Sequence, residues 1–244
     1  MFIKQLAVIF LTALVTVTRA QDTVTHHTPV TVSGNIQLTN NGTAPVPIFA
    51  LGKPAIIAST TIRKGRFYAN PEQYFSFSAK PWTLNNRIGV FLVDNKNFWL
   101  TYSTNISLFF LDRNPNANHG EEFQTQRYWA QEFTGEYRFT PKYKLQFLYW
   151  HTNDMDKLGI NREEFVNAAF LFDSLLLGPK NIFTFKPSAF YLFDDGALEG
   201  VFAAQTTTYQ RARWGFNLFV QTTFPVHVVP RNKFIWNGGV NIPF

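Results

Sequence analysis

Residues 98–110 alternate between apolar and polar side chains, and this pattern constrains the fold more than any other feature of the sequence. Phe, Leu, Tyr, Ile and Phe occupy even positions, whereas Thr101, Ser103, Asn105 and Ser107 stand between them. Side chains of a β-strand point to opposite faces in turn, so the stretch has one apolar and one largely polar face. Its 13 residues exceed the average strand of about 5–6. A tilted strand crosses a bilayer with about 9–11 residues, so this one is long enough to span.

The same alternation recurs in five further stretches, in which aromatic and aliphatic residues alternate with polar ones. The polar positions share the face that we expect to point inward, and they are Glu132, Glu136, Arg138, Lys144, Lys186, Arg213, Asn217, Gln221, Lys233, Asn237 and Asn241. Charged residues make up only 16% of the chain and aromatic residues 17%, whereas soluble domains average about 25% charged. Aromatic-rich apolar faces favour a sheet that faces lipid, and a sheet within a bilayer must close because open edges are forbidden there.

We therefore predict an all-β fold, a transmembrane antiparallel up-and-down β-barrel of about 12 strands, with an exported soluble β-sandwich as the alternative. The expected strands are 31–40, 55–68, 72–79, 86–94, 97–110, 123–139, 143–152, 164–174, 181–193, 200–209, 212–222 and 233–244. Short turns are expected on the periplasmic side, the first near Asn70-Pro71, and longer connections outside, among them 80–87 and 194–200. Ten strands is the alternative, because residues 63–66 (Arg-Lys-Gly-Arg) interrupt the pattern.

The first 20 residues are typical of a secretory signal peptide, with Lys4 before an apolar run and Thr18-Arg19-Ala20 at the cleavage site. We expect a signal peptide at 1–20, a flexible periplasmic tail at 21–30 and the barrel at 31–244. The chain has no cysteine, which excludes disulfide scaffolds, cysteine-ligated zinc, iron–sulfur clusters and thiol catalysis.

The end of the sequence resembles the last-strand signal of Gram-negative outer-membrane β-barrel proteins. Phe244 supplies the terminal aromatic residue, with Trp236, Val240 and Ile242 at alternate positions behind it, although Pro243 departs from the usual penultimate residue. The resemblance extends over the signal peptide, the strand pattern and the terminus. It implies an outer-membrane location and recognition by the barrel-assembly machinery. The residues around the cleavage site are similar to those of Bacteroidota proteins.

The inward charges support two hypotheses about function. In the first, the protein is a porin-like passive channel for small polar or anionic solutes, with lysines and arginines lining a water-filled path. Twelve strands leave more interior than the eight that side chains just fill. In the second, a polar network closes the barrel, which then serves as a structural or accessory subunit of a larger outer-membrane complex. Changing Arg213 and Lys233 to Glu is expected to invert the ion preference of a channel.

A third hypothesis is an outer-membrane hydrolase. His151, Asp154 and Asp156 lie at the outer end of one expected strand, where omptin-type proteases keep an Asp/His set, and a histidine beside carboxylates can act as a general base. A second Asp pair is missing, so we expect no catalytic residues. We also expect no metal site, because His26 and His27 have no third ligand, and no cofactor. The expected partners are outer-membrane lipids and lipopolysaccharide, the assembly machinery and other outer-membrane proteins. Nucleic acid is not expected, because the net charge of +6 is modest and dispersed.

Overall fold

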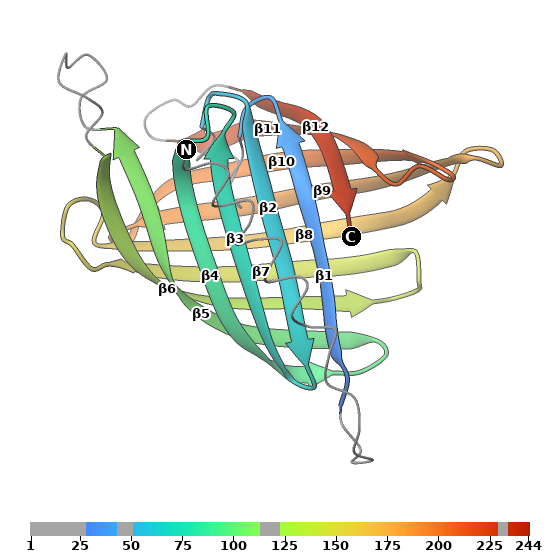
Figure 1. The fold of residues 1–244 in the computed structure, drawn as a ribbon, viewed down its shortest axis with the longest axis horizontal. Helices are drawn as coiled ribbons and strands as arrows, with labels where there is room; N and C mark the ends of the chain where they lie inside the picture. The colour runs from blue at the N-terminus through green and yellow to red at the C-terminus, as the bar shows by residue number, and fades with distance from the viewer. Residues whose placement is uncertain (1–27, 43–50, 113–122, 229–233) are drawn as a thin grey trace, which may run out of the picture.

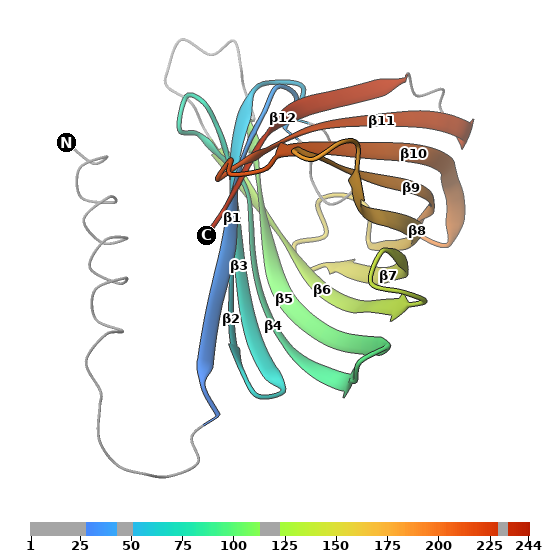
Figure 2. The ribbon, with the colours of Figure 1, turned by 90° about the vertical axis from the view of Figure 1, so that its right-hand side faces the viewer.

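The computed structural model describes residues 28–42, 51–112, 123–228 and 234–244. In these ranges the chain forms twelve β-strands that make a closed antiparallel barrel, shown from two sides in Figures 1 and 2. Every strand pairs with its neighbours in sequence, and the first strand pairs with the last. The prediction of a twelve-stranded up-and-down barrel is confirmed, and the alternative of ten strands is wrong. In the described part of the chain, no helix is long and apolar enough to cross a membrane.

The strands are β1 (Val30–Thr39), β2 (Ala55–Lys64), β3 (Phe67–Ser76), β4 (Pro81–Asp94), β5 (Phe98–Asp112), β6 (Phe123–Arg138), β7 (Tyr143–Asp154), β8 (Arg162–Leu176), β9 (Asn181–Asp194), β10 (Ala197–Arg211), β11 (Asn217–Val228) and β12 (Ile235–Pro243). The start of β1 and the end of β12 lie at one end of the barrel, together with the turns β2–β3, β4–β5, β6–β7, β8–β9 and β10–β11. We call it the turn end, and the opposite end the loop end. The expected signal peptide at 1–20 and residues 21–27 of the expected tail lie outside the described residues.

The first turn differs from the prediction. Gly65 and Arg66 connect β2 to β3, whereas Asn70 and Pro71, where the sequence suggested a turn, lie inside β3. Gly65 has a φ of 60°, which glycine adopts without the Cβ clash that other residues meet. The charged run that interrupts the alternation is therefore the turn itself, and the strand pattern resumes directly after it.

Two expected long connections are also shorter than predicted. β4 begins at Pro81 and takes up nearly all of 80–87. Only Asp195 and Gly196 separate β9 from β10, with φ values of 49° and 85°. Two consecutive residues with positive φ match the right-handed twist of the strands on either side, and this makes a tight hairpin turn.

The seam that closes the barrel is short. Residues 35–39 of β1 pair with 239–243 of β12, and Gly34 and Phe244 extend the pairing with two backbone hydrogen bonds of 2.9 and 3.0 Å. Figure 1 accordingly shows β12 ending part-way along β1. A Cβ atom on Gly34 would lie 2.2 Å from Cζ of Phe244. The aromatic ring therefore lies directly over the glycine, and the seam depends on that position having no side chain.

The two faces of the wall differ in composition. In β7, Tyr143, Leu145, Phe147 and Tyr149 are exposed on the outside, while the residues between them point inward. Inside the barrel, a cluster of buried apolar side chains fills the space along β7–β10, and its members are Leu148, Trp150, Phe165, Phe190, Phe202 and Ala204. The rings of Phe190 and Phe202 are stacked with centroids 4.7 Å apart, and Phe165 lies 5.3 Å from Phe190. We call this group the phenylalanine cluster.

Candidate functional site

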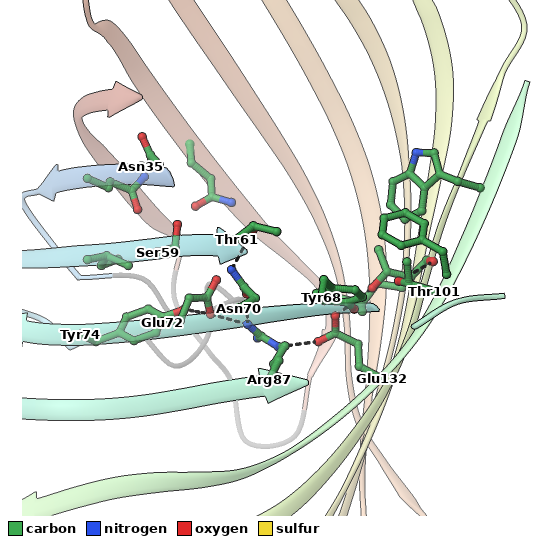
Figure 3. A pocket seen from close by; sticks show the side chains of 17 residues that line it. Asn35, Ser59, Thr61, Tyr68, Asn70, Glu72, Tyr74, Arg87, Thr101 and Glu132 are labelled. Atoms are coloured by element: carbon green, nitrogen blue, oxygen red, sulfur yellow. Dashed lines mark hydrogen bonds and ion pairs between the residues drawn. The ribbon is translucent and has the colours of Figure 1, made fainter. Parts of the chain in front are cut away.

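A cavity of about 610 Å³ lies inside the barrel against β1–β6 (Figure 3). It extends from Trp99 and Tyr68, near the turn end, to Arg87 in the middle of β4. Eight of its lining side chains carry aliphatic hydroxyl or amide groups, and these are Asn35, Gln37, Ser59, Thr61, Asn70, Thr101, Thr134 and Gln221. Such a lining offers hydrogen-bond donors and acceptors without a formal charge.

The charged groups of the cavity form one connected set. Arg87 Nη1 lies 2.6 Å from Glu72 Oε2, and Arg87 Nε lies 3.2 Å from Glu132 Oε2. The same Nη1 donates to Asn70 Oδ1 at 3.2 Å, and the hydroxyl of Tyr74 donates to Glu72 at 2.9 Å. Figure 3 shows the guanidinium between the two carboxylates. The side chains of Arg87, Glu72 and Glu132 are only 12%, 21% and 18% exposed, so each charge has lost most of its hydration and is compensated by an opposite charge.

Arg87 and Glu132 also mark the inner limit of the cavity. On the loop-end side they line a second pocket of only about 20 Å³, together with Asn85, Ser107 and Trp150. The hydroxyl of Ser107 is hydrogen-bonded to Asn85 there. Among the described residues, the pocket on the turn-end side of Arg87 is therefore much larger than the one on its loop-end side, and the phenylalanine cluster fills the side along β7–β10.

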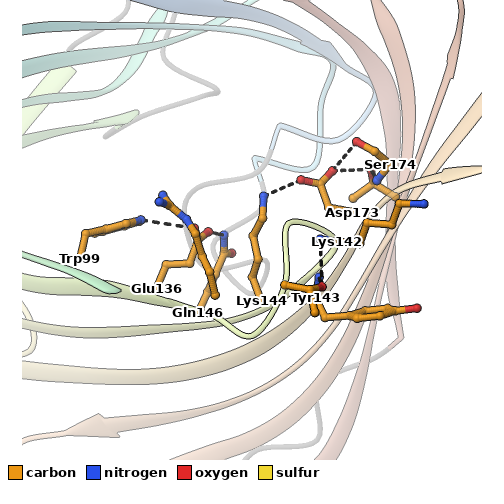
Figure 4. A network of polar contacts seen from close by, with 11 residues as sticks. Trp99, Glu136, Lys142, Tyr143, Lys144, Gln146, Asp173 and Ser174 are labelled. Atoms are coloured by element: carbon orange, nitrogen blue, oxygen red, sulfur yellow. Dashed lines mark hydrogen bonds and ion pairs between the residues drawn. The ribbon is translucent and has the colours of Figure 1, made fainter. Parts of the chain in front are cut away.

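Several of the predicted inward residues form a second network near the turn end (Figure 4). Glu136 accepts hydrogen bonds from Arg138 Nε at 2.8 Å, Gln146 Nε2 at 2.9 Å and the indole N–H of Trp99 at 3.3 Å. Lys144 Nζ lies 2.6 Å from an oxygen of Asp173. The basic groups of this network thus have carboxylate partners and do not present isolated positive charge to the lumen.

The remaining predicted lumen residues are more scattered. Gln221 lines the cavity, and Asn241 Nδ2 donates to Asn217 Oδ1 at 2.9 Å. Asn237 is buried beside Thr39, which donates a hydrogen bond to it. Lys186 occupies an inward position of β9, opposite Thr206 of β10.

Two members of the predicted set are not on described strands. Arg213 lies in the β10–β11 turn with a φ of 76°, although the alternation suggested a strand there. Lys233 lies outside the described residues. Neither residue is therefore placed at the cavity.

The residues that resemble a last-strand signal lie on β12 and directly after it. Trp236, Ile242 and Phe244 are 55%, 39% and 60% exposed, and Val240 shares their alternate positions, opposite Leu38 of β1. Their side chains are on the outer surface, at the seam of the barrel.

The histidine and aspartates considered for hydrolysis do not form a joint site. His151 shares the outward face of β7 with Tyr149, and its ring nitrogens lie 2.9 Å from Asn153 and 3.6 Å from Glu164. Asp154 is on the opposite face of that strand, where its carboxylate accepts backbone N–H groups of the four residues 156–159 at 2.8–3.0 Å.

Asp156 follows in the β7–β8 loop and pairs with Arg127, whose Nη2 lies 2.6 Å from its Oδ1. Hydrogen bonds from Arg127 hold the pKa of Asp156 below its usual range. Asp154 and Asp156 thus order the loop. No three acidic or histidine side chains gather into a metal-binding group in the ranges that the structure describes.

The residues at the centre of the cavity were not among the predicted inward residues, and they are Glu72, Arg87 and the aromatic side chains of β3–β5. For the residues of β3 the reason is the misplaced turn at Asn70-Pro71, which removed the middle of that strand from the alternation. When residues 67–76 are treated as one strand, Asn70, Glu72 and Tyr74 fall at alternate, inward positions. This pattern identifies the polar wall of the cavity.

No protein-family model and no curated protein matches the sequence. The fold is similar to that of the KdgM porin, solved in complex with disordered oligogalacturonate, with a TM-score of 0.53, 10% identity, and coverage of 88% of this chain and 99% of that one. It is also similar to an outer membrane channel from Pseudomonas putida F1, with a TM-score of 0.50, 10% identity, and coverage of 92% of this chain and 100% of that one. The chain therefore has the fold of outer-membrane β-barrels.

Proposed function

We propose that this protein is a passive channel for small polar solutes in the outer membrane. The observation that carries the proposal is the cavity of about 610 Å³, lined by hydroxyl and amide groups inside a barrel whose outer face is apolar. A polar interior of this kind holds water and lets hydrated solutes exchange hydrogen bonds with the wall. A porin and a channel share the fold, which supports the proposal at the level of architecture.

The charged groups that line the cavity favour uncharged polar solutes over anions. Arg87 stands between two glutamates, so the three charged groups that line the cavity sum to one negative charge. Arg138 and Lys144 are paired with Glu136 and Asp173. An anion that enters the cavity meets no surplus of positive charge. The anionic solutes expected from the lysine and arginine pattern are therefore not part of this proposal.

Single-channel recording in a planar bilayer tests the proposal directly. The refolded full chain is expected to give stepwise ohmic currents of small amplitude, because the passage narrows at Arg87 and Glu132. Replacement of chloride by a larger anion is expected to change the current little. A barrel that is folded by circular dichroism but carries no current contradicts the proposal.

The phenylalanine cluster favours a second candidate, the closed barrel that serves as a structural or accessory subunit. Phe165, Phe190 and Phe202 are each about 1% exposed and fill one side of the lumen. For a subunit, the aromatic outer face would contact another outer-membrane protein in addition to lipid. Copurification of one stoichiometric outer-membrane partner in mild detergent, together with silent bilayers, would support this candidate over the channel.

A further inference from the structure

We infer that the cavity binds a small neutral saccharide, stacked against Tyr68, Phe91 and Trp99 and hydrogen-bonded by the amide and hydroxyl groups around them. The inference rests on the proposed function in one respect, since the solute must reach the cavity from the turn end. It names the class of solute that the wall of the cavity recognises.

Three aromatic side chains form a continuous stripe on one wall of the cavity. Tyr68 is on β3, Phe91 on β4 and Trp99 on β5, so each comes from the next strand in the sheet. The ring centroids of Tyr68 and Phe91 are 5.6 Å apart, and those of Phe91 and Trp99 are 6.3 Å apart. Neighbouring rings are inclined by 64° and 62°. The stripe begins at the turn-end mouth of the cavity, where a solute would first meet the wall.

The rings are held in place by their surroundings. A Cβ atom on Gly89, opposite Tyr68 in the sheet, would lie 2.4 Å from Cζ of the tyrosine. The tyrosine ring therefore occupies the space directly over Gly89 of β4. The indole N–H of Trp99 is bonded to Glu136 at 3.3 Å, and the Arg63 guanidinium lies 3.7 Å from the centroid of Phe91. A preorganised aromatic surface loses little conformational entropy when a ligand stacks on it.

Polar groups that both donate and accept hydrogen bonds line the cavity beside the stripe. Asn35 and Gln37 lie on β1 and Ser59 lies on the neighbouring strand β2. Gln221 lines the same space from β11, which is separated from β1 by β12. An amide offers two donors and one carbonyl acceptor, and a hydroxyl offers both roles. A pyranose ring has apolar C–H groups on its face and hydroxyl groups around its edge. The cavity presents the matching pair of surfaces, an aromatic one and a polar one.

The charged groups and the volume of the cavity narrow the class of saccharide further. A sugar acid or sugar phosphate needs a free cation, but Arg87 already bonds to two carboxylates and Arg63 is paired with Asp94. A neutral sugar needs no counter-charge. The volume of about 610 Å³ lies within the range of about 300–1,000 Å³ found for small-molecule sites. These features together point to neutral mono- or disaccharides.

Isothermal titration of the refolded full chain in detergent with maltose tests the inference, because binding in a micelle needs no passage through the barrel. We expect maltose to bind and the digalacturonate anion to bind more weakly. Trp99→Ala is expected to lower the maltose affinity about tenfold, since loss of one stacking partner of this kind removes about 1.4 kcal/mol. Trp129→Ala is the matched control, because Trp129 is exposed on the outer face and its indole N–H is bonded in the same way, to Thr104 at 2.9 Å.

The outcomes separate the saccharide site from the channel. Ion currents without maltose binding overturn the saccharide site and leave the channel standing. Maltose binding without ion currents overturns the channel and leaves the saccharide site standing. Tighter binding of digalacturonate than of maltose overturns the preference for neutral sugars. Equal losses in Trp99→Ala and Trp129→Ala overturn the aromatic stripe as the binding surface. If Trp99→Ala fails to fold, Phe91→Leu replaces it, with the same expected loss.

Discussion

Arg87 on β4 extends over β5 to Glu132 on β6, with its Nε atom 3.2 Å from the carboxylate oxygen Oε2. The same guanidinium bonds to Glu72 on β3 at 2.6 Å. One side chain thus connects charges on three strands inside the barrel. It also stands where the polar cavity ends, so the groups that stabilise the wall are the groups that limit the passage.

Removal of Arg87 is expected to destabilise the barrel strongly. Arg87→Met leaves two poorly hydrated glutamates without a counter-charge, and breaking a buried pair in this way costs about 3–5 kcal/mol. Unfolding by guanidinium chloride in detergent, followed by tryptophan fluorescence, measures the loss. The triple variant Arg87→Met, Glu72→Gln, Glu132→Gln is expected to recover most of it. A triple variant as unstable as the single one would show that packing, and not charge, is responsible.

The phenylalanine cluster makes a prediction about both stability and conductance. Phe190→Ala removes a ring that is stacked 4.7 Å from Phe202, and truncations of buried phenylalanine cost about 3–5 kcal/mol. The space left behind widens the lumen, so a larger single-channel current is expected. Tyr191→Ala, on the outer face of the same strand, is the control and is expected to leave the current unchanged. An unchanged current in Phe190→Ala would show that the cluster does not limit conduction.

The seam between β1 and β12 is expected to tolerate no side chain at Gly34. A methyl group there would lie 2.2 Å from the Phe244 ring and 2.7 Å from the carbonyl oxygen of Ser59. Gly34→Ala must displace the ring, and overpacking of this kind costs about 1–3 kcal/mol. Gly238→Ala is the control, since its nearest neighbour would be 3.5 Å away. Equal melting temperatures for the two variants would contradict the role of the Gly34–Phe244 contact.

The β7–β8 loop is expected to loosen only in acid. Because Arg127 lowers the pKa of Asp156, their pairing is complete at neutral pH and is lost as the pH falls through the lowered value. Amide protection in residues 155–161 should therefore stay constant from pH 7 to about pH 4 and fall below it. Hydrogen exchange at each pH, corrected for the intrinsic exchange rate, measures the amide protection of these residues. Asp156→Asn should show the reduced protection at every pH. If the variant is protected as well as the unmodified loop, loss of the Arg127–Asp156 pair is not the cause of the loosening in acid.

The fold follows closely from the sequence because strand alternation is a local property. The period of two in 98–110 identified a membrane-spanning strand and the face on which Thr101 and Ser103 lie, and both are buried inward positions of β5. Recurrence of the pattern together with the turn signals predicted about twelve strands, with ten as the alternative, and closure followed because an open sheet has no stable place in a bilayer. The weak points were turns: Gly65 places the β2–β3 turn before the position predicted for it, and Gly196 permits a β9–β10 connection shorter than the one predicted.

The state of the lumen was decided only by the tertiary structure. Alternation predicts that Glu132 points inward, but not that Arg87, two strands away, meets it there. The partner of an inward side chain depends on the register between strands and on the tilt of the barrel, which no single strand encodes. The same registers bring three phenylalanines together on one side and an aromatic stripe with amides on the other. The sequence by itself thus determined a barrel with a polar interior, and the packing of side chains from distant strands decided which part of that interior is filled and which is open.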